Sequence, residues 1–256
     1  MLLITILYLV FLFTPIALLL IGAFGESWSN TILPVGFTWQ WFEQLASDPS
    51  FRRAFWTSIK VVLATCVLNI LIGVPLAYAI YASARRGVQL AAKIMALLPI
   101  AVPDLVLGFG FILVFSSDTL PWLGSIWLLI AAHTILTIPY TVNTVLADMQ
   151  QQRLDSYEQV AATLSAGFWT RQKDIVLPLI GTSIFSSLLM VAALSIGEFQ
   201  ISNLIAGFLS RTYPVVLLQA FYGATGFACA ATVVLLFLAI LASLGSTATS
   251  TLTKRG

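Results

Sequence analysis

Charged residues are scarce in this sequence, and their scarcity excludes a water-soluble domain. Only 9% of the 256 residues are charged, whereas a soluble domain carries about 25%. So few charges could not cover a surface that faces water, although they suit a surface that faces lipid. The net charge is only +2, so nothing in the charge balance indicates a nucleic-acid partner.

Cysteine and histidine are almost absent, which leaves no pattern typical of a metal site. Cys66 and Cys229 fall inside apolar runs and form no metal-spaced or CxxC cluster, so we interpret them as small buried or lipid-facing side chains. His133 is the only histidine, and we expect it to be hydrogen-bonded between helices. The phosphate loop GxxxxGK(S/T), which holds nucleotides, is also missing.

Apolar residues are what the sequence has in abundance, at 59% of the chain with a mean hydropathy of +0.99. Runs of about 20 apolar residues can cross a bilayer, and in lipid they must be helical because exposed backbone amides find no other partners. We therefore predict an all-α polytopic membrane bundle of about six transmembrane helices, forming a single domain over residues 1–256. The predicted spans lie at about residues 3–24, 56–82, 90–115, 123–147, 175–197 and 224–249.

The first run and the loop after it allow two interpretations each. The run is too long and uninterrupted for a typical signal-peptide core and has no Lys or Arg before it, so we expect a retained first span, with a cleaved signal as the alternative. The outer loop 25–55 is rich in aromatic residues, which favour the headgroup layer. A short helix on the outer interface explains it, and a docking surface for an external partner is the alternative. The core bundle then occupies residues 56–249.

The placement of basic residues predicts the orientation. An excess of them in the loops after the second and fourth spans and at the C-terminus marks these segments as cytoplasmic, and so places both termini inside. The first set is Arg85, Arg86, Lys93, Arg153, Arg171, Lys173, Lys254 and Arg255. The alternate loops hold Arg52, Arg53 and Arg211, with Lys60 just inside the second span.

The cytoplasmic connection over residues 150–174 carries the most information, since it is far longer than the usual link between neighbouring helices. Small residues from Ser165 to Gly167 allow a helix to stop there. We predict a short amphipathic helix before them, which either fits a groove on a soluble partner or rests on the lipid surface. Its apolar face recurs at spacings of three and four: Leu154, Tyr157, Ala161 and Leu164.

This connection resembles the cytoplasmic "EAA" loop in permease subunits of binding-protein-dependent ABC importers, which reads Glu-Ala-Ala-x-x-x-Gly and later Ile-x-Leu-Pro. Aligned on residues 175–178, the Glu-Ala-Ala positions fall on residues 159–161, with Glu158 one step earlier. The family's glycine falls on Ser165, which is a departure. The resemblance implies that a set of residues in and after this connection couples the chain to an ATPase. They are Leu154, Tyr157, Glu158, Gln159, Val160, Ala161, Leu164, Ser165, Gly167, Leu177 and Pro178.

Other stretches resemble the same family in the same order along nearly the whole chain: residues 37–42, 73–78, 98–103 and 195–199. The resemblance implies a multi-pass protein of the bacterial cytoplasmic membrane, surrounded by lipid. It implies that this chain binds no cofactor and is no enzyme, while ATP and Mg act on two separate ATP-binding subunits. The further partners it implies are a second permease subunit, the same chain or a sister, and a periplasmic or tethered solute-binding protein.

Two acids in or near the spans are candidate solute-path residues, because charges at membrane depth are costly and usually functional. Glu198 lies at the outer end of the fifth span, where it could also simply be wetted by the interface. Asp104 follows Pro103 in the third span, where a kink could expose it to a cavity. Asn69 and Asn143 are expected to hydrogen-bond between helices.

The solute is indicated by two short stretches. Residues 197–199 resemble permeases for phosphonate, thiamine, iron or oxyanions more than polyamine permeases, and residues 32–38 resemble those for 2-aminoethylphosphonate. The resemblance implies a small polar solute, with a phosphonate expected first and polyamine, thiamine, ferric iron or an oxyanion as alternatives.

Two other classes of membrane protein are the alternatives to an importer. A membrane-embedded enzyme would need clustered acids, Arg or His. An ion-coupled carrier would need mid-span charges or inverted repeats.

Overall fold

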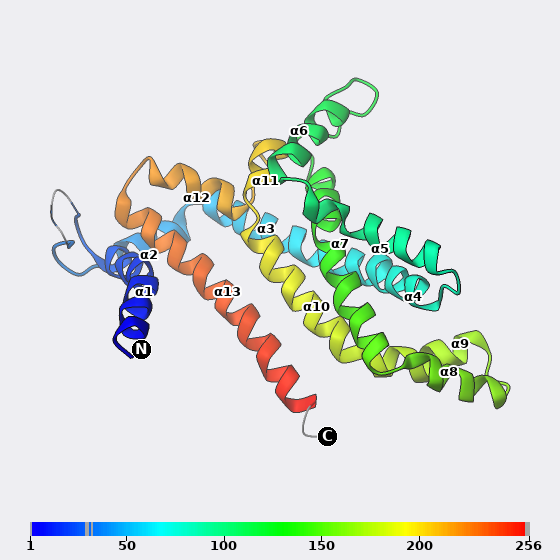
Figure 1. Cartoon of the computed structure of the whole chain (residues 1–256). Helices are drawn as coiled ribbons and strands as arrows, with labels where there is room; N and C mark the ends of the chain where they lie inside the picture. The colour runs from blue at the N-terminus through cyan, green and yellow to red at the C-terminus, as the bar shows by residue number, and fades with distance from the viewer. Residues whose placement is uncertain (1, 29–30, 32, 254–256) are drawn as a thin grey trace.

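The computed structural model describes residues 2–28, 31 and 33–253 (Figure 1). Within these ranges the regular structure is helical apart from two isolated bridges, so the predicted all-α class is confirmed. Three residues used in the predictions lie outside the described ones: Ile32 in the outer loop and Lys254 and Arg255 at the C-terminus.

The helices follow one another along the chain, with longer connections at residues 25–39 and 116–125. In order they are α1 (Leu2–Phe24), α2 (Gln40–Ser47), α3 (Pro49–Leu68), a π-helical turn η1 (Asn69–Gly73), α4 (Val74–Ala82), α5 (Arg86–Ala101), α6 (Asp104–Phe115), α7 (Ile126–Gln151), α8 (Leu154–Thr163), α9 (Phe168–Arg171), a second π-helical turn η2 (Gln172–Val176), α10 (Leu177–Gly197), α11 (Gln200–Ile205), α12 (Tyr213–Phe221) and α13 (Thr225–Thr253).

Several described helices are long and apolar enough to cross a bilayer. Four do so as continuous helices: α1, the joined α3 and α4, α7, and the joined α9 and α10. The pair of α5 and α6 adds a fifth if it is counted as one span, and the apolar part of α13 over Thr225–Ile240 is shorter. A multi-pass membrane bundle is thus confirmed, whereas the count of six spans stays a prediction.

The third apolar run, predicted as one span over residues 90–115 with a kink at Pro103, is not one continuous helix. α5 ends at Ala101 and α6 begins at Asp104, with a bend of 95° between them. Val102 is extended, at φ −94° and ψ 128°, because the ring of the following Pro103 disfavours helical backbone at the residue before it. The break turns the first residue of α6 toward the cavity described below.

The second span begins earlier than predicted, at Pro49 instead of residue 56. Asp48 Oδ1 accepts hydrogen bonds from the backbone N–H groups of Ser50, at 2.7 Å, and Phe51, at 3.0 Å. An aspartate cap followed by proline in the first helical position is a strong start signal. The predicted outer loop 25–55 therefore contains both α2, which confirms a short helix there, and the first turns of α3.

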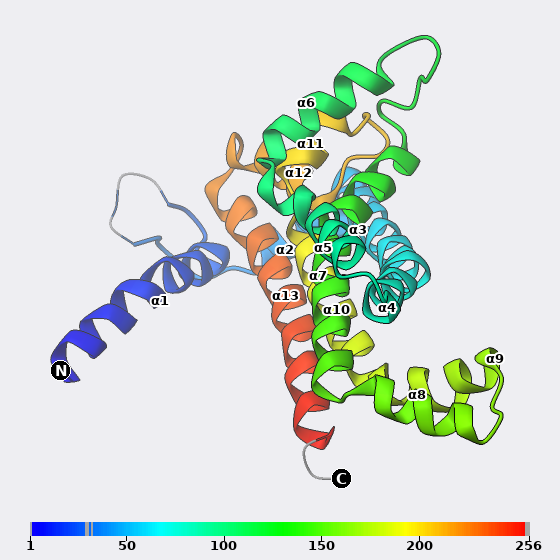
Figure 2. The same cartoon turned by 45° about the vertical axis from the view of Figure 1, so that its right-hand side comes forward.

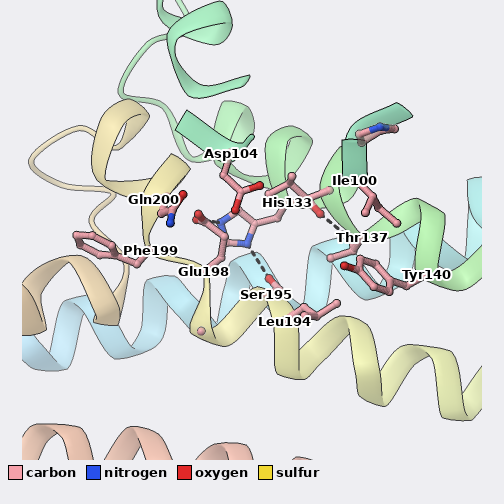
Figure 3. A pocket seen from close by; sticks show the side chains of 13 residues that line it. Ile100, Asp104, His133, Thr137, Tyr140, Leu194, Ser195, Glu198, Phe199 and Gln200 are labelled. Atoms are coloured by element: carbon pink, nitrogen blue, oxygen red, sulfur yellow. Dashed lines mark hydrogen bonds and ion pairs between the residues drawn. The ribbon is translucent and has the colours of Figure 1, made fainter. Parts of the chain in front are cut away.

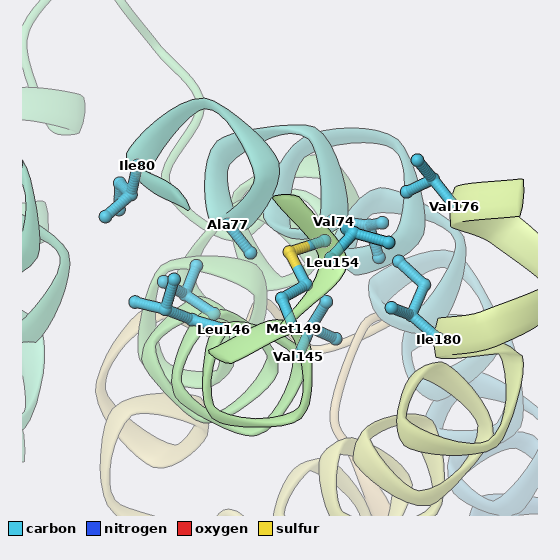
Figure 4. Close-up of a cluster of buried hydrophobic side chains, with 10 residues drawn as sticks. Val74, Ala77, Ile80, Val145, Leu146, Met149, Leu154, Val176 and Ile180 are labelled. Carbon is cyan, nitrogen blue, oxygen red and sulfur yellow. The ribbon is translucent and has the colours of Figure 1, made fainter. Parts of the chain in front are cut away.

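α7 is the central helix of the bundle and packs against α3, α4, α5 and α10. Toward its C-terminal end, Val145 and Met149 are buried among Val74 and Ala77 of α4 and Ile180 of α10 (Figure 4). Burial of such side chains removes apolar area from polar surroundings at this end, where α8 and α9 leave the bundle.

Polar side chains fix α7 against the turn η1. Asn69 is fully buried; its Nδ2 donates to Thr137 Oγ1 at 2.9 Å, and its Oδ1 accepts from Thr141 Oγ1 at 2.9 Å. The predicted interhelical role of Asn69 is confirmed. Asn143 is half-buried, and its role stays a prediction.

α1 packs on α13 near its own C-terminal end. Ala23 is buried with Cys229 and Ala230, and Gly22 permits the close approach, because a Cβ there would lie 2.8 Å from Cys229 Sγ. Most other side chains of α1 are apolar and exposed, and Figure 2 shows the N-terminal part pointing away from the bundle. Such a surface suits contact with lipid tails.

Candidate functional site

α8 and α9 project from one end of the bundle (Figures 1 and 2). α7 ends at Gln151, and Arg153 takes a left-handed backbone conformation with φ 52°, which redirects the chain into α8. The predicted short helix over this segment is therefore present as Leu154–Thr163.

The apolar face predicted for this helix is divided between two surroundings. Leu154 and Ala161 are buried against the chain's own bundle, whereas Tyr157 and Leu164 are exposed. Val160, one of the residues assigned to coupling, is also exposed and lies beside them at helical spacing. The free apolar stripe of α8 is thus Tyr157, Val160 and Leu164.

Two further exposed apolar residues, both aromatic, follow the end of α8 in α9. Trp169 is 81% exposed, and the ring of Phe168 packs edge-on against it with centroids 5.4 Å apart. We call the five residues Tyr157, Val160, Leu164, Phe168 and Trp169 the exposed apolar stripe.

Ser165 ends α8 in a left-handed conformation with φ 60°. Its N–H donates to the carbonyl of Ala162, and the N–H of Ala166 donates to that of Ala161, both at 3.0 Å. These two bonds form a Schellman motif, which favours glycine at the left-handed position. The position on which the family's glycine falls is therefore the one that needs a positive φ.

Two tyrosines of α4 connect this segment to the bundle. Tyr78 Oη donates to Glu158 Oε1 at 2.8 Å. Tyr81 Oη donates to Asp155 Oδ1 and accepts from the backbone N–H of Asp155, both at 2.9 Å. Arg171 lies 4.0 Å from Glu158. We call the two tyrosine contacts the tyrosine links.

Of the remaining residues assigned to coupling, Leu177 and Pro178 form the first turn of α10, directly after η2. Gln159 is exposed on α8 beside the tyrosine links, and Gly167 precedes α9 in extended conformation. Most of the assigned residues therefore lie on the protruding segment around α8, whereas Leu177 and Pro178 begin the bundle helix α10.

A second feature is a cavity of about 390 Å³ between α5, α7 and α10. It contains both acids that the sequence singled out, Glu198 at the end of α10 and Asp104 at the start of α6 (Figure 3). None of the described residues that line it is Lys or Arg. The cavity therefore presents two acidic side chains and no Lys or Arg among its described lining residues.

Glu198 is held by an extended set of contacts. Its Oε1 accepts from the N–H of Ile201 at 2.7 Å, and its Oε2 accepts from the N–H and Oγ of Ser202 at 3.0 and 2.5 Å. His133 Nε2 lies 3.4 Å from Glu198 Oε2. These contacts fix the carboxylate at the bend between α10 and α11.

His133 is 1% exposed and lies between three helices. Its Nδ1 lies 2.7 Å from Ser195 Oγ of α10, and its Nε2 lies 3.0 Å from Ser202 Oγ of α11. The prediction of a histidine hydrogen-bonded between helices is confirmed. Its contact with Glu198 was not foreseen, because the two lie 65 residues apart along the chain.

The described chain is thus a bundle of helices long enough to cross a membrane, with a cavity between them and a short helical segment outside it. Residues 69–250 match the family described as "Binding-protein-dependent transport system inner membrane component". The chain belongs to this family: it is a permease subunit of a binding-protein-dependent ABC importer and a multi-pass inner-membrane protein.

Relatives in this family carry different solute names. The chain is 30% identical over 203 residues to "Putative 2-aminoethylphosphonate transport system permease protein PhnV" of Salmonella typhimurium, covering 78% of this chain and 74% of that protein. It is 26% identical to the spermidine/putrescine permease PotC of Haemophilus influenzae, with coverage of 77% and 75%. It is 31% identical to the molybdenum permease ModB of Mycobacterium tuberculosis, with coverage of 69% and 71%.

Solved structures show the same fold. A bacterial alginate ABC transporter in complex with its oligosaccharide-bound periplasmic protein contains a chain that matches with a TM-score of 0.76 at 19% identity, covering 98% of this chain and 92% of that one. A further structure of a bacterial alginate importer matches with a TM-score of 0.71 over 100% and 94% of the two chains, also at 19% identity.

Because Ser165 has a left-handed backbone, glycine at this position and glycine at Ser156 should have opposite effects on α8. Ser165→Gly should increase protection of the α8 amides from hydrogen exchange, since glycine takes a positive φ without the steric cost of about 1–2 kcal/mol. Ser156→Gly, in the first turn of α8, should lower protection because glycine has a lower helix propensity than serine. Equal losses for both variants would contradict a left-handed residue 165.

Proposed function

We propose that this chain imports a small polar solute that carries an ammonium group, with 2-aminoethylphosphonate as the first candidate. An external binding protein delivers the solute, and two separate ATP-binding subunits, which hold ATP and Mg, drive its passage. The chain itself performs no chemistry and binds no cofactor. It pairs with a second permease subunit, either a second copy or a sister chain, and retains α1 as a membrane span.

The observation that carries this proposal is the exposed apolar stripe on α8 and α9. Leu164 is 78% exposed and Trp169 is 81% exposed, although both belong to a segment that leaves the bundle. Apolar side chains in one row on a short helix fit a groove on a protein partner. We therefore place the ATP-binding subunits at this end, which makes it cytoplasmic and puts the start of α7 on the outer side.

The tyrosine links explain how movement of α8 enters the bundle. They join the acidic face of α8 to α4, and α4 packs on the central helix α7. Displacement of α8 by an ATP-binding subunit would therefore pull on α4 through two hydrogen-bonded contacts to carboxylates, which are stronger than neutral ones. In this proposal α4 receives the motion, and α7 and the cavity beside it respond.

The charge of the cavity supports an ammonium-bearing solute over a pure oxyanion. Asp104 and Glu198 both line it, and its described lining holds no Lys or Arg. Opposite charges attract strongly in a cavity of low dielectric, and like charges repel. Polyamine, thiamine and ferric iron are positively charged and would be attracted by this lining as well. Molybdate-like oxyanions would be repelled.

Replacing one exposed leucine tests the docking end. Leu164→Asp should abolish co-purification of the ATP-binding subunits, because a charge would be buried in an apolar contact. The matched control is Leu120→Asp, an exposed leucine in the loop before α7 at the opposite end, which should leave co-purification intact. If Leu164→Asp still binds the ATP-binding subunits fully, the exposed apolar stripe is not their docking surface.

The tyrosine links can be removed without removing their rings. In the double variant Tyr78→Phe and Tyr81→Phe, solute uptake per ATP hydrolysed should fall severalfold, since each lost bond to a carboxylate weakens the link by about 1.5–3 kcal/mol. Hydrolysis itself should continue. Tyr222→Phe serves as control, because Tyr222 is 85% exposed and lies between α12 and α13, away from α8. If the ratio of solute uptake to ATP hydrolysis does not change in the double variant, α4 is not the helix that receives the motion.

The cavity acids can be neutralised one at a time with little change of shape. Asp104→Asn should lower uptake of 2-aminoethylphosphonate about tenfold, the effect of losing about 1.4 kcal/mol of attraction. Solute affinity of the purified binding protein should not change. The measurement is uptake into proteoliposomes that contain the complete importer, compared with uptake of an oxyanion. Equal loss for both solutes would contradict a role for charge in selection.

A further inference from the structure

A recess of about 660 Å³ lies at the end of the bundle opposite α8, between α3, the start of α7 and the loop after α11. One face of α3 supplies half of its lining, with residues spaced three, four and seven apart: Arg53, Trp56, Thr57 and Lys60. Gly124, Ile126, Leu209 and Ser210 complete it. The recess is separate from the cavity at Glu198.

The recess holds two positive charges that are not neutralised by a described acidic residue. Arg53 and Lys60 are both exposed, and neither forms an ion pair with another described residue. No described residue that lines the recess is acidic. Since the chain has few charges in total, two cations on one helix face without a counter-charge leave a local site that favours an anion.

Thr57 adds an unused hydrogen-bond donor between the two cations. Its side chain is 7% exposed and lines the recess, and its hydroxyl bonds to no other residue in the described ranges. A hydroxyl placed between two cations in this recess can donate to a ligand that accepts hydrogen bonds.

Exposed tryptophans indicate that the recess lies at the level of the lipid headgroups, the layer that tryptophan prefers. Trp56 lines the recess, and the exposed Trp122 and Trp127 flank its lining residues Gly124 and Ile126 along the chain. Lys60 precedes the end of the joined α3 and α4 helix at Ala82 by 22 residues, or about 33 Å. That distance is close to the hydrocarbon thickness of about 30 Å.

We propose that Arg53, Thr57 and Lys60 form a binding site for a phosphoryl or phosphonyl oxyanion at the outer membrane surface. A guanidinium, an ammonium and a hydroxyl together match the several acceptor oxygens of such a group. The oxyanion comes either from a phospholipid headgroup or from free phosphate or phosphonate. The level of the site rests on the membrane placement proposed above, whereas its charge and donor do not.

The first measurement is retention of phosphatidylglycerol by the complete importer in detergent, followed by native mass spectrometry during lipid titration. Arg53→Gln and Lys60→Gln should each weaken binding about fivefold, the effect of one cation near a lipid surface. Thr57→Val should weaken it as well. Arg52→Gln is the matched control, because it removes the same charge from the neighbouring residue, which does not line the recess.

A second measurement separates the two sources of the oxyanion. Inorganic phosphate is titrated into the lipid-depleted importer by calorimetry, with chloride at equal ionic strength as reference. Lipid retention that depends on Arg53 and Lys60, without phosphate binding, identifies a headgroup site. Phosphate binding that depends on the same residues identifies a site for free oxyanions. Either result supports the proposal.

The proposal is overturned if neither ligand distinguishes Arg53→Gln and Lys60→Gln from Arg52→Gln. It is also overturned if these variants alter only the affinity of the solute-binding protein, because the recess would then bind an acidic protein surface. Both measurements require neither ATP hydrolysis nor uptake. Their failure would therefore leave the proposed import function standing, and failure of import would leave the binding result valid.

Discussion

The polar contacts along α7 are the constraint on which the arrangement of the bundle depends. In lipid, apolar side chains gain little by choosing a protein neighbour over a lipid tail, so interhelical hydrogen bonds and close packing decide which helices meet and in which register. Thr137 and Thr141 hold α7 to Asn69, and His133 holds it to α10 and α11. The cavity opens beside these contacts, so the groups that fix the bundle also shape its interior.

The helical class and most helix positions could be predicted from the sequence, because apolar length alone decides membrane spans. The end of α8 was predicted from the small residues around Ser165. The start signal of α3, Asp48 followed by Pro49, was present in the sequence but was missed, because the span was placed by its apolar residues alone. Pro103 indicated a kink within one span, but an apolar run carries no signal for how sharply the chain bends there.

The candidate site was only partly predictable, because contacts between distant residues leave no local pattern. Glu198 and Asp104 were found as isolated acids, but the approach of His133 to Glu198 depends on how α7 and α10 pack. Likewise, the spacing on α8 gave one apolar face, whereas the bundle buries Leu154 and Ala161 and leaves Tyr157 and Leu164 free. Helical periodicity identifies a row of side chains, and packing decides which of them a partner can reach.

The wide turn η1 affects how α4 is rotated about the helix axis relative to α3. A π-helical turn holds one residue more than a regular one, so α3 and α4 are out of register by one residue, or about 100° of rotation. Deleting a single residue there would restore a regular helix and swing α4 around its axis. Tyr78 and Tyr81 would then point away from Glu158 and Asp155, although none of the four residues had changed. The extra residue of the π-helical turn thus determines which way the side chains of α4 point.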